Sequence, residues 1–210
     1  MASSKNLKMV AYNTLKRKIM LNELEPNEYL EEKKLCEMLN ISRTPIREAI
    51  SMLEWEQFVQ VIPNKGIFVS DISIRMIKEL FQVRHMFEPE AARLALPNLD
   101  ADMLMEYRHR FLDGLERKDY ATLHQMDYDF HNDINAACSN KYLTRILNNI
   151  SDQFQRVRTM SFYTAERTEN GAREHLELIH LMLQNESEEV ARLMQKHISS
   201  TETYFFKSLI

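Results

Sequence analysis

The chain has 210 residues, of which only three are Gly and five are Pro. An all-β sandwich needs such residues at many turns, and a phosphate-binding loop needs several Gly, so both are disfavoured. The net charge is −4, no apolar run approaches the roughly 18 residues of a membrane span, and the first residues lack the apolar core of a signal peptide. We therefore expect a mainly α-helical, soluble protein of the cytoplasm.

The composition changes along the chain. Residues 1–70 contain ten Lys or Arg and nine Asp or Glu, whereas residues 71–210 contain seventeen and twenty-two. All seven His follow position 80, and all five Pro lie at or before position 97. Two domains are therefore expected, the first over residues 1–72 and the second over residues 73–210.

The first domain is predicted to contain three helices followed by a hairpin. Apolar residues recur at helical spacing over residues 7–22 and 31–39. Pro45 suits the first turn of a third helix, because its missing amide needs no partner there. Two short apolar runs with a Gly-containing turn between them then indicate a β-hairpin over 58–62 and 67–70. This order of elements is that of a winged helix-turn-helix.

The outer face of the third predicted helix carries residues that suit DNA recognition. Arg43 and Arg47 are four positions apart, so they project from one face, where each can pair with guanine or hold phosphate. Lys65 and Gly66 place a cation and a residue without a side chain in the hairpin turn, which favours close approach to a DNA backbone. Each of these residues alone is more often a solvated surface residue, but the order of the elements favours DNA binding.

Two segments of this domain resemble the DNA-binding domain of the GntR family of bacterial transcription regulators. They are LEEKKLCEMLNISRTPIREAISMLE (30–54) and FVQVIPNKGIFV (58–69). The resemblance implies that four residues contact DNA: Arg43, Thr44 and Arg47 on the helix and Gly66 at the wing tip. Lys33 stands where the family usually has an Arg, so it can hold phosphate but lacks the bidentate geometry of a guanidinium.

The second domain is predicted to be an antiparallel bundle of six helices, because apolar periodicity continues to the end of the chain. Candidate N-caps are Asp100, Asp119 and Ser187. Four residues fall at or near the predicted breaks, where a positive φ is useful: Gly114, Asn140, Gly171 and Asn185. The six helices are expected at 73–96, 100–117, 119–138, 141–167, 171–184 and 187–207.

Three His and one Asp fall on core-facing stripes of this bundle. Asp127 and His131 are one helical turn apart, and His175 and His197 lie on two later helices, so the four side chains can converge in the interior. Three imidazoles and one carboxylate suit Zn²⁺, Ni²⁺, Fe²⁺ or Mn²⁺. A core-facing His is more often only hydrogen-bonded, however, and a buried Asp needs some partner, so spacing alone leaves both interpretations open.

Four segments of the second domain resemble the FadR-type ligand-binding domain called FCD. In the metal-binding branch of that family, the ligands follow the pattern D-x-x-x-H, E-H and a distal H-[LI]. This pattern implies the ligands Asp127, His131, His175 and His197. The segments are LFQVRHMFEPEAARLAL (80–96), DYDFHNDINAACSNKYL (127–143), EHLELI (174–179) and MQKHI (194–198).

Two arginines are candidates for binding an effector. By the same resemblance, Arg84 belongs to the motif V-R-x-x-[LF]-E, near the pocket or the dimer face. It can pair with the carboxylate of an effector, or equally with Glu88 one turn later as a structural ion pair. Arg158 is a second effector candidate of the same kind.

The resemblance spans nearly the whole chain and implies a GntR-like transcription regulator of the FadR type. We expect a homodimer that binds a palindromic double-stranded operator as a repressor. A small carboxylate effector would bind in the bundle, held partly by the divalent metal ion.

Two alternatives are weighed. One is a hydrolase whose Asp/His₃ site activates water, and the other is a winged-helix regulator whose bundle only dimerises. No additional general acid or base is identifiable near the four predicted ligands, so we do not expect an enzyme.

Overall fold

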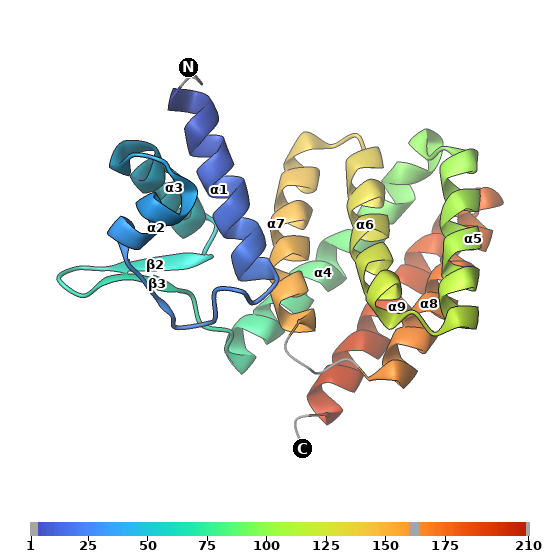
Figure 1. The fold of residues 1–210 in the computed structure, drawn as a ribbon. Coiled ribbons are helices and arrows are strands. Elements are labelled where there is room, and N and C mark those ends of the chain that lie inside the picture. The colour runs from blue at the N-terminus through green and yellow to red at the C-terminus, as the bar shows by residue number, and fades with distance from the viewer. Residues whose placement is uncertain (1–3, 160–163, 209–210) are drawn as a thin grey trace. The chain divides into compact units, whose positions relative to one another are not determined.

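The computed structural model describes residues 4–159 and 164–208 (Figure 1). These residues form two compact units. The first runs to Ile74 and includes the segment that begins at Gln155, and the second contains Arg75–Phe154 and the described residues from Thr164 onward. In the described part of the chain, no helix has both the length and the apolar character that crossing a membrane requires. The predicted domain boundary at residues 72 and 73 stays a prediction.

The first unit has the predicted order of helix, helix, turn, helix and hairpin, and the prediction of a mainly helical fold with a winged helix-turn-helix is confirmed. Its described elements are α1 (Ser4–Met20), β1 (Tyr29–Leu30), α2 (Glu32–Leu39), α3 (Arg43–Trp55), β2 (Val59–Ile62) and β3 (Gly66–Val69). The predicted limits of the helices differ from these by a few residues, as is usual where a helix end frays.

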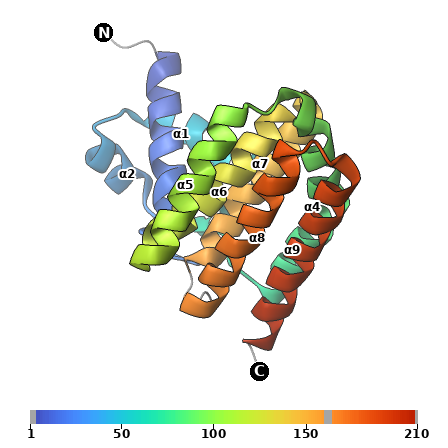
Figure 2. The same ribbon diagram turned by 90° about the vertical axis from the view of Figure 1, so that its right-hand side faces the viewer.

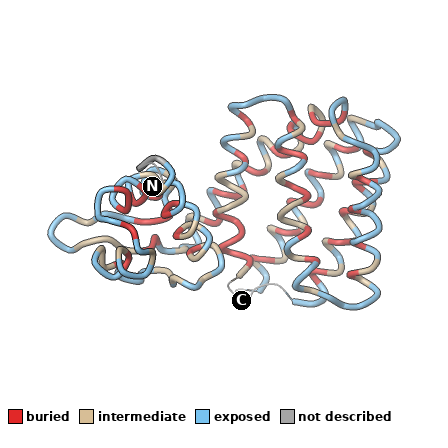
Figure 3. Tube along the Cα trace, turned by 45° about the horizontal axis from the view of Figure 1, so that its top comes forward, coloured by how far each residue is buried: buried red, intermediate tan, exposed pale blue. Residues whose placement is uncertain are grey.

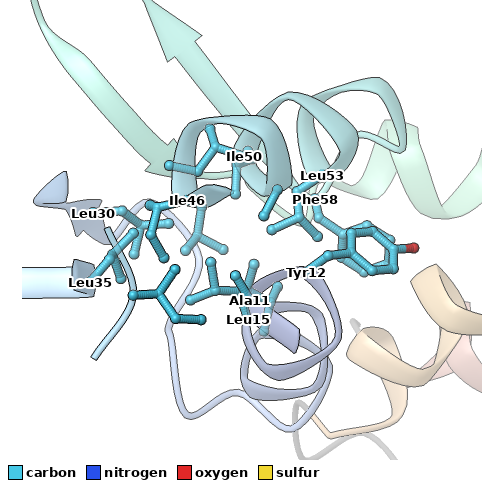
Figure 4. Close-up of a cluster of buried hydrophobic side chains, with 14 residues drawn as sticks. Ala11, Tyr12, Leu15, Leu30, Leu35, Ile46, Ile50, Leu53 and Phe58 are labelled. Atoms are coloured by element: carbon cyan, nitrogen blue, oxygen red, sulfur yellow. The ribbon is translucent and has the colours of Figure 1, made fainter. Parts of the chain in front are cut away.

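The core of the first unit lies between the helices and the sheet. Residues four apart on α1 and α3 share one face of each helix, and these faces meet Leu35 of α2 and Phe58 before β2 (Figure 4). Burial of this apolar surface stabilises the unit and leaves the opposite face of α3 exposed. The buried residues of α1 and α3 include Ala11, Leu15, Ile19, Ile46, Ile50 and Leu53.

The hairpin gains a third strand that the sequence did not predict. The sheet order is β1-β3-β2 with antiparallel pairs, and Tyr29 of β1 lies opposite Phe68 of β3. A strand of two residues is too short to show alternation, so only its pairing identifies it. Gly66 has a φ of 115°, and a Cβ there would lie 2.5 Å from Tyr29 Cε2. The wing therefore requires Gly at position 66.

The second unit is built from helices, as predicted (Figure 2). Helix α8 packs against α5, α6 and α9 and so contacts both neighbours that carry predicted metal ligands. Buried and exposed positions alternate along these helices with the helical period (Figure 3). The described helices are α4 (Ile74–Ala95), the 3₁₀ helix η1 (Leu96–Asn98), α5 (Ala101–Arg117), α6 (Tyr120–Ala137), α7 (Lys141–Arg158), α8 (Ala165–Leu183) and α9 (Ser187–Lys207).

One predicted helix break is wrong. The expected helix over 141–167 ends at Arg158 as α7, and α8 already begins at Ala165. Thr164 caps α8, because its side chain accepts a hydrogen bond from the backbone N–H of Arg167. Gly171 therefore lies inside α8 and not at a break. Residues 160–163 of the predicted helix lie outside the described residues.

The other helix ends follow the prediction in part. Asp100 and Asp119 act as N-caps, whereas Ser187 is the first residue of α9 and its N-cap position is Glu186. Asn185 has a φ of 58°, as expected. Gly114 lies inside α5, where a Cβ would come within 2.7 Å of Leu123 Cδ2, so this Gly allows a close approach of α5 and α6. The left-handed positions expected at Gly114 and Asn140 are occupied instead by Lys118 and Ser139.

Candidate DNA-binding surface and metal centre

The predicted DNA-binding residues of α3 lie at its exposed N-terminal end. Arg43, Thr44 and Arg47 are exposed, while Pro45 and Ile46 between them are buried. The helix thus anchors one face in the core and presents cations and a hydroxyl on the other. A helix with this arrangement can enter the major groove without disturbing the core.

Glu32 of α2 holds the Arg47 side chain. Arg47 Nε donates to Glu32 Oε1 at 2.7 Å and to Oε2 at 2.9 Å, and this hydrogen bond raises the pKa of Arg47. Glu32 is the only hydrogen-bond partner of this guanidinium among the described residues. Glu32 was not among the residues predicted to affect DNA binding, although it begins α2, the helix that precedes α3.

The remaining predicted DNA contacts are also exposed or lie in the wing. Lys33 Nζ on α2 is 3.9 Å from Glu37 Oε1, which is a weak exposed ion pair. Lys65 is exposed in the turn between β2 and β3, where its backbone N–H donates to Ile62 O, and Gly66 begins β3. The first unit therefore contains all six predicted DNA-binding residues at its surface or in its wing, and their role stays a prediction.

The four predicted metal ligands come together in the second unit. One ligand atom from each of Asp127, His131, His175 and His197 can be chosen so that all four atoms lie within 4.8 Å of one another. Asp127 and His131 come from α6, His175 from α8 and His197 from α9. The three His side chains are buried, and Asp127 is half-buried. We call these four residues the Asp/His cluster.

Two distances within the Asp/His cluster match the separation of donors that share one ion, and a third is longer. His175 Nε2 is 3.2 Å from Asp127 Oδ1 and 3.3 Å from His131 Nε2, and His131 Nε2 is 3.8 Å from Asp127 Oδ1. Donors that each lie about 2.1 Å from one ion are about 3.0–3.4 Å apart at octahedral or tetrahedral angles. The donor set of imidazoles and one carboxylate is also the one that divalent transition metals prefer.

Glu88 of α4 contacts one of the predicted ligands, His131. Its Oε2 lies 3.2 Å from His131 Nδ1, so a proton on Nδ1 leaves Nε2 of the same ring for the cluster. Glu88 also accepts hydrogen bonds from Arg84 Nε at 2.5 Å and Nη2 at 3.2 Å. Burial alone would raise the pKa of Glu88, but the Arg84 guanidinium and the His131 ring hold it far below its usual range. The carboxylate is therefore ionised.

Arg84 forms the structural ion pair with Glu88 that was one of its two predicted roles. Arg84 is 2% exposed, its guanidinium lies 4.2 Å from the centre of the Phe154 ring, and it binds Glu88 as the structural interpretation requires. Because Glu88 also contacts His131, Arg84 belongs to the surroundings of the Asp/His cluster. Binding of an effector by Arg84 stays a prediction.

Glu174 contacts a second predicted ligand, His197. Its Oε2 accepts from His197 Nδ1 at 2.7 Å and from Arg167 Nη2 at 2.9 Å. Burial raises the pKa of Glu174, but hydrogen bonds to His197 and Arg167 outweigh burial and lower the pKa to about 2. Burial lowers the pKa of His197 itself, which favours the neutral imidazole that a metal ion requires.

Arg158 lies at the end of α7 in the segment that belongs to the first unit. Its Nη1 donates to Gln155 Oε1 at 3.4 Å, within that segment. The role of Arg158 as an effector ligand stays a prediction.

Family comparisons identify both parts of the chain. The model described as "Bacterial regulatory proteins, gntR family" matches residues 7–69, and the model of the FCD domain matches residues 79–200. The chain therefore belongs to the GntR family of bacterial transcription regulators, in the FadR-like group that carries an FCD domain.

Relatives of this chain are named as transcription regulators. The chain is 26% identical over 190 residues to the HTH-type transcriptional repressor RspR of Escherichia coli (strain K12), covering 89% of this chain and 83% of the repressor. It is 26% identical over 200 residues to the repressor GlaR of the same organism, covering 89% and 90% of the two chains. The Nta operon transcriptional regulator of Aminobacter aminovorans is 25% identical over 175 residues, which cover 82% of each chain.

Solved structures share the fold. Escherichia coli McbR/YncC superimposes with a TM-score of 0.83 at 19% identity over all of both chains. Lar, which controls the expression of the Listeria monocytogenes agr system, gives a TM-score of 0.62 at 22% identity, covering 95% of this chain and 96% of Lar. At this identity the likeness concerns the fold alone.

Proposed function

We propose that this GntR regulator is a homodimeric repressor that binds a palindromic operator and releases it when a small carboxylate binds next to a metal ion in the bundle. The observation that carries this proposal is the convergence of four ligand atoms within 4.8 Å, in a unit that accompanies a winged helix-turn-helix. The names of RspR and GlaR support repression. Regulation of bacterial operators would place the protein in the cytoplasm.

The Asp/His cluster would hold the ion through Asp127 Oδ1 and the imidazoles of its three histidines. A divalent ion with open coordination positions supplies Lewis-acid sites for a carboxylate oxygen. Glu88 and Glu174 fix the tautomers of His131 and His197, and their own ionised state balances part of the ion's charge. The chain thus supplies an ordered, largely buried donor set.

The effector would act by preferring one arrangement of the dimer over another. A ligand shifts such an equilibrium only by its differential affinity for the two arrangements. Binding of the carboxylate must therefore be weaker when the operator is bound, and operator binding must be weaker when the carboxylate is present. This reciprocity gives the proposal a quantitative check.

A gel shift with the protein's own upstream DNA tests the regulator function. We expect Arg47→Ala to weaken operator binding by about 10-fold to 100-fold, the effect of losing one base contact. Arg145→Ala, which removes an exposed cation from α7, should bind like the wild type. Equal affinities for all three proteins would contradict the assignment of α3 as the recognition helix.

Metal analysis of the purified protein separates this function from the dimerisation-only alternative. We expect about one divalent ion per chain in the wild type and strong depletion in His175→Ala, because His175 lies between the other ligands. A wild type that stays metal-free after gentle purification and does not bind added Zn²⁺, Ni²⁺ or Mn²⁺ would favour a bundle that only dimerises. The relatives are named as transcription regulators. These names do not distinguish a metal-dependent sensor from a bundle that only dimerises, but they count against the hydrolase.

A further inference from the structure

A pocket lined by polar and charged residues lies on the surface of α8 and α9. It has a volume of about 390 Å³, and none of the four residues of the Asp/His cluster lines it. The α9 residues that line it repeat at the spacing of one helix face, from Lys196 to Lys207. Its described lining consists of Arg167, Asn170, Lys196, Ser199, Ser200, Thr203, Tyr204 and Lys207.

The residues that line this pocket are either cationic or neutral and polar. Three of the lining residues are cations, four carry hydroxyl groups and one is an amide, and no Asp or Glu lines the pocket among the described residues. The ammonium groups of Lys196 and Lys207 are on exposed residues. A polar helix face on a soluble protein usually mixes both signs of charge, as the neighbouring Glu188, Glu189 and Arg192 do.

Arg167 gives the pocket a buried cation. The residue is 3% exposed, and its Nη2 donates to Glu174 Oε2 at 2.9 Å and to Thr201 Oγ1 at 2.7 Å. Its Nε has no hydrogen-bond partner among the described residues. A buried donor in a native protein normally has a partner, and an ion or ordered water is the usual one when protein groups do not supply it.

We propose that this pocket binds a small oxyanion, either a phosphate group or a carboxylate group of a metabolite. Ammonium and guanidinium groups make charge-assisted hydrogen bonds to such oxygens, and hydroxyl groups add further donors. Lys196 and Lys207 supply the accessible charges, and Arg167 forms the buried end. None of the four residues of the Asp/His cluster lines the pocket, although Arg167 also donates to Glu174, the hydrogen-bond partner of His197.

Calorimetric titration of the full-length, metal-depleted protein tests the site, with inorganic phosphate in one arm and citrate in the other, so that citrate cannot bind a metal ion at the Asp/His cluster. We expect saturable binding of at least one probe, weakened at least tenfold in the double variant Lys196→Ala/Lys207→Ala. The matched control Lys141→Ala/Arg145→Ala removes two exposed cations from α7 and should bind like the wild type. The stronger probe identifies the class of oxyanion.

A second control separates this pocket from the DNA-binding surface, which also attracts anions. The variant Arg43→Ala/Arg47→Ala should retain the binding seen in the wild type. The proposal is overturned if the wild type binds neither probe, if the Lys196/Lys207 variant binds as tightly as the wild type, or if binding is lost in the Arg43/Arg47 variant. Circular dichroism of each variant checks that these surface substitutions leave the fold intact.

Discussion

The ion pair between Glu32 and Arg47 places a carboxylate next to a predicted DNA contact. Both side chains are at least partly exposed, so the pair contributes only about 0–1 kcal/mol to stability. Its larger effect concerns DNA. Glu32 restrains the guanidinium of Arg47 and also repels phosphate. When Arg47 contacts DNA it loses its ion pair with Glu32, so binding is favoured only where the DNA contact compensates for that loss.

Glu32→Gln should therefore tighten binding to unrelated DNA severalfold and reduce the ratio of operator to unrelated affinity. Competition gel shifts at one fixed salt concentration measure this ratio. Glu37→Gln is the matched control, because Glu37 is an exposed carboxylate on the same helix that approaches Lys33 only at 3.9 Å. An unchanged ratio in Glu32→Gln would show that this carboxylate has no part in discrimination.

Replacing Gly by Ala should change the free energy of unfolding in opposite directions at positions 66 and 171. Gly66→Ala should lower the free energy of unfolding by about 1–3 kcal/mol, because φ is 115° and the new Cβ would meet the Tyr29 ring. Gly171→Ala should raise it by about 0.5–1 kcal/mol, because Gly171 lies inside α8 and its nearest contact, Arg167 Nη2, is 3.7 Å away. Urea denaturation of both variants measures these changes, and a loss of stability in Gly171→Ala would be inconsistent with the space around that position.

At the scale of elements, the Asp/His cluster contains residues from three helices, α6, α8 and α9. A bound ion would stabilise the folded bundle by mass action, so removal of the ion should lower the melting temperature. We expect EDTA to lower the melting temperature of the wild type by several degrees and to leave His175→Ala unchanged. An equal effect on both proteins would mean that EDTA acts elsewhere.

The same site predicts a pH dependence. Metal binding requires neutral imidazoles, so affinity for the ion should fall as the pH is lowered and protons compete for the ligands. Burial lowers the pKa of His197, which extends the metal-competent range of this ligand toward lower pH. Calorimetric Ni²⁺ titrations at pH 7.5 and pH 5.5 measure the difference.

Elements with long periodic patterns were predictable from the sequence, because a buried stripe at helical spacing is visible without coordinates. The same stripes placed His131, His175 and His197 inside the bundle. Short or polar features were not predictable: β1 has two residues, and the start of α8 depends on the hydroxyl cap of Thr164. Glu88 and Glu174 were not predicted as partners of the ligands, because a carboxylate on a helix usually faces water and only packing shows otherwise.

At the scale of the whole molecule, net charge conceals the predicted DNA-binding surface. The chain carries −4, and the acidic excess belongs to residues 71–210, whereas residues 1–70 are nearly neutral. Recognition therefore depends on where the cations lie. Lys33, Arg43, Arg47 and Lys65 are all exposed on the first unit.

The proposed homodimer would have two such surfaces, so its binding to DNA should show a steep salt dependence. Each phosphate contact contributes about −0.9 to the slope of log K against log salt concentration. Replacing Lys65 by Ala in both protomers should reduce the magnitude of the slope by about 2 and weaken binding to all sequences nearly equally. Filter binding at several salt concentrations measures the slope, and an unchanged slope would mean that the wing lysine does not contact phosphate.

Trp55 is the last residue of α3 and the only Trp in the chain. The residue is 89% exposed. Its fluorescence in the folded protein should therefore resemble that of a solvated indole. Heating or urea will therefore shift its emission little, even while circular dichroism records the loss of the helices. The same residue is a sensitive optical reporter of anything that covers the end of α3, because contact with another molecule is what would move its emission to shorter wavelength.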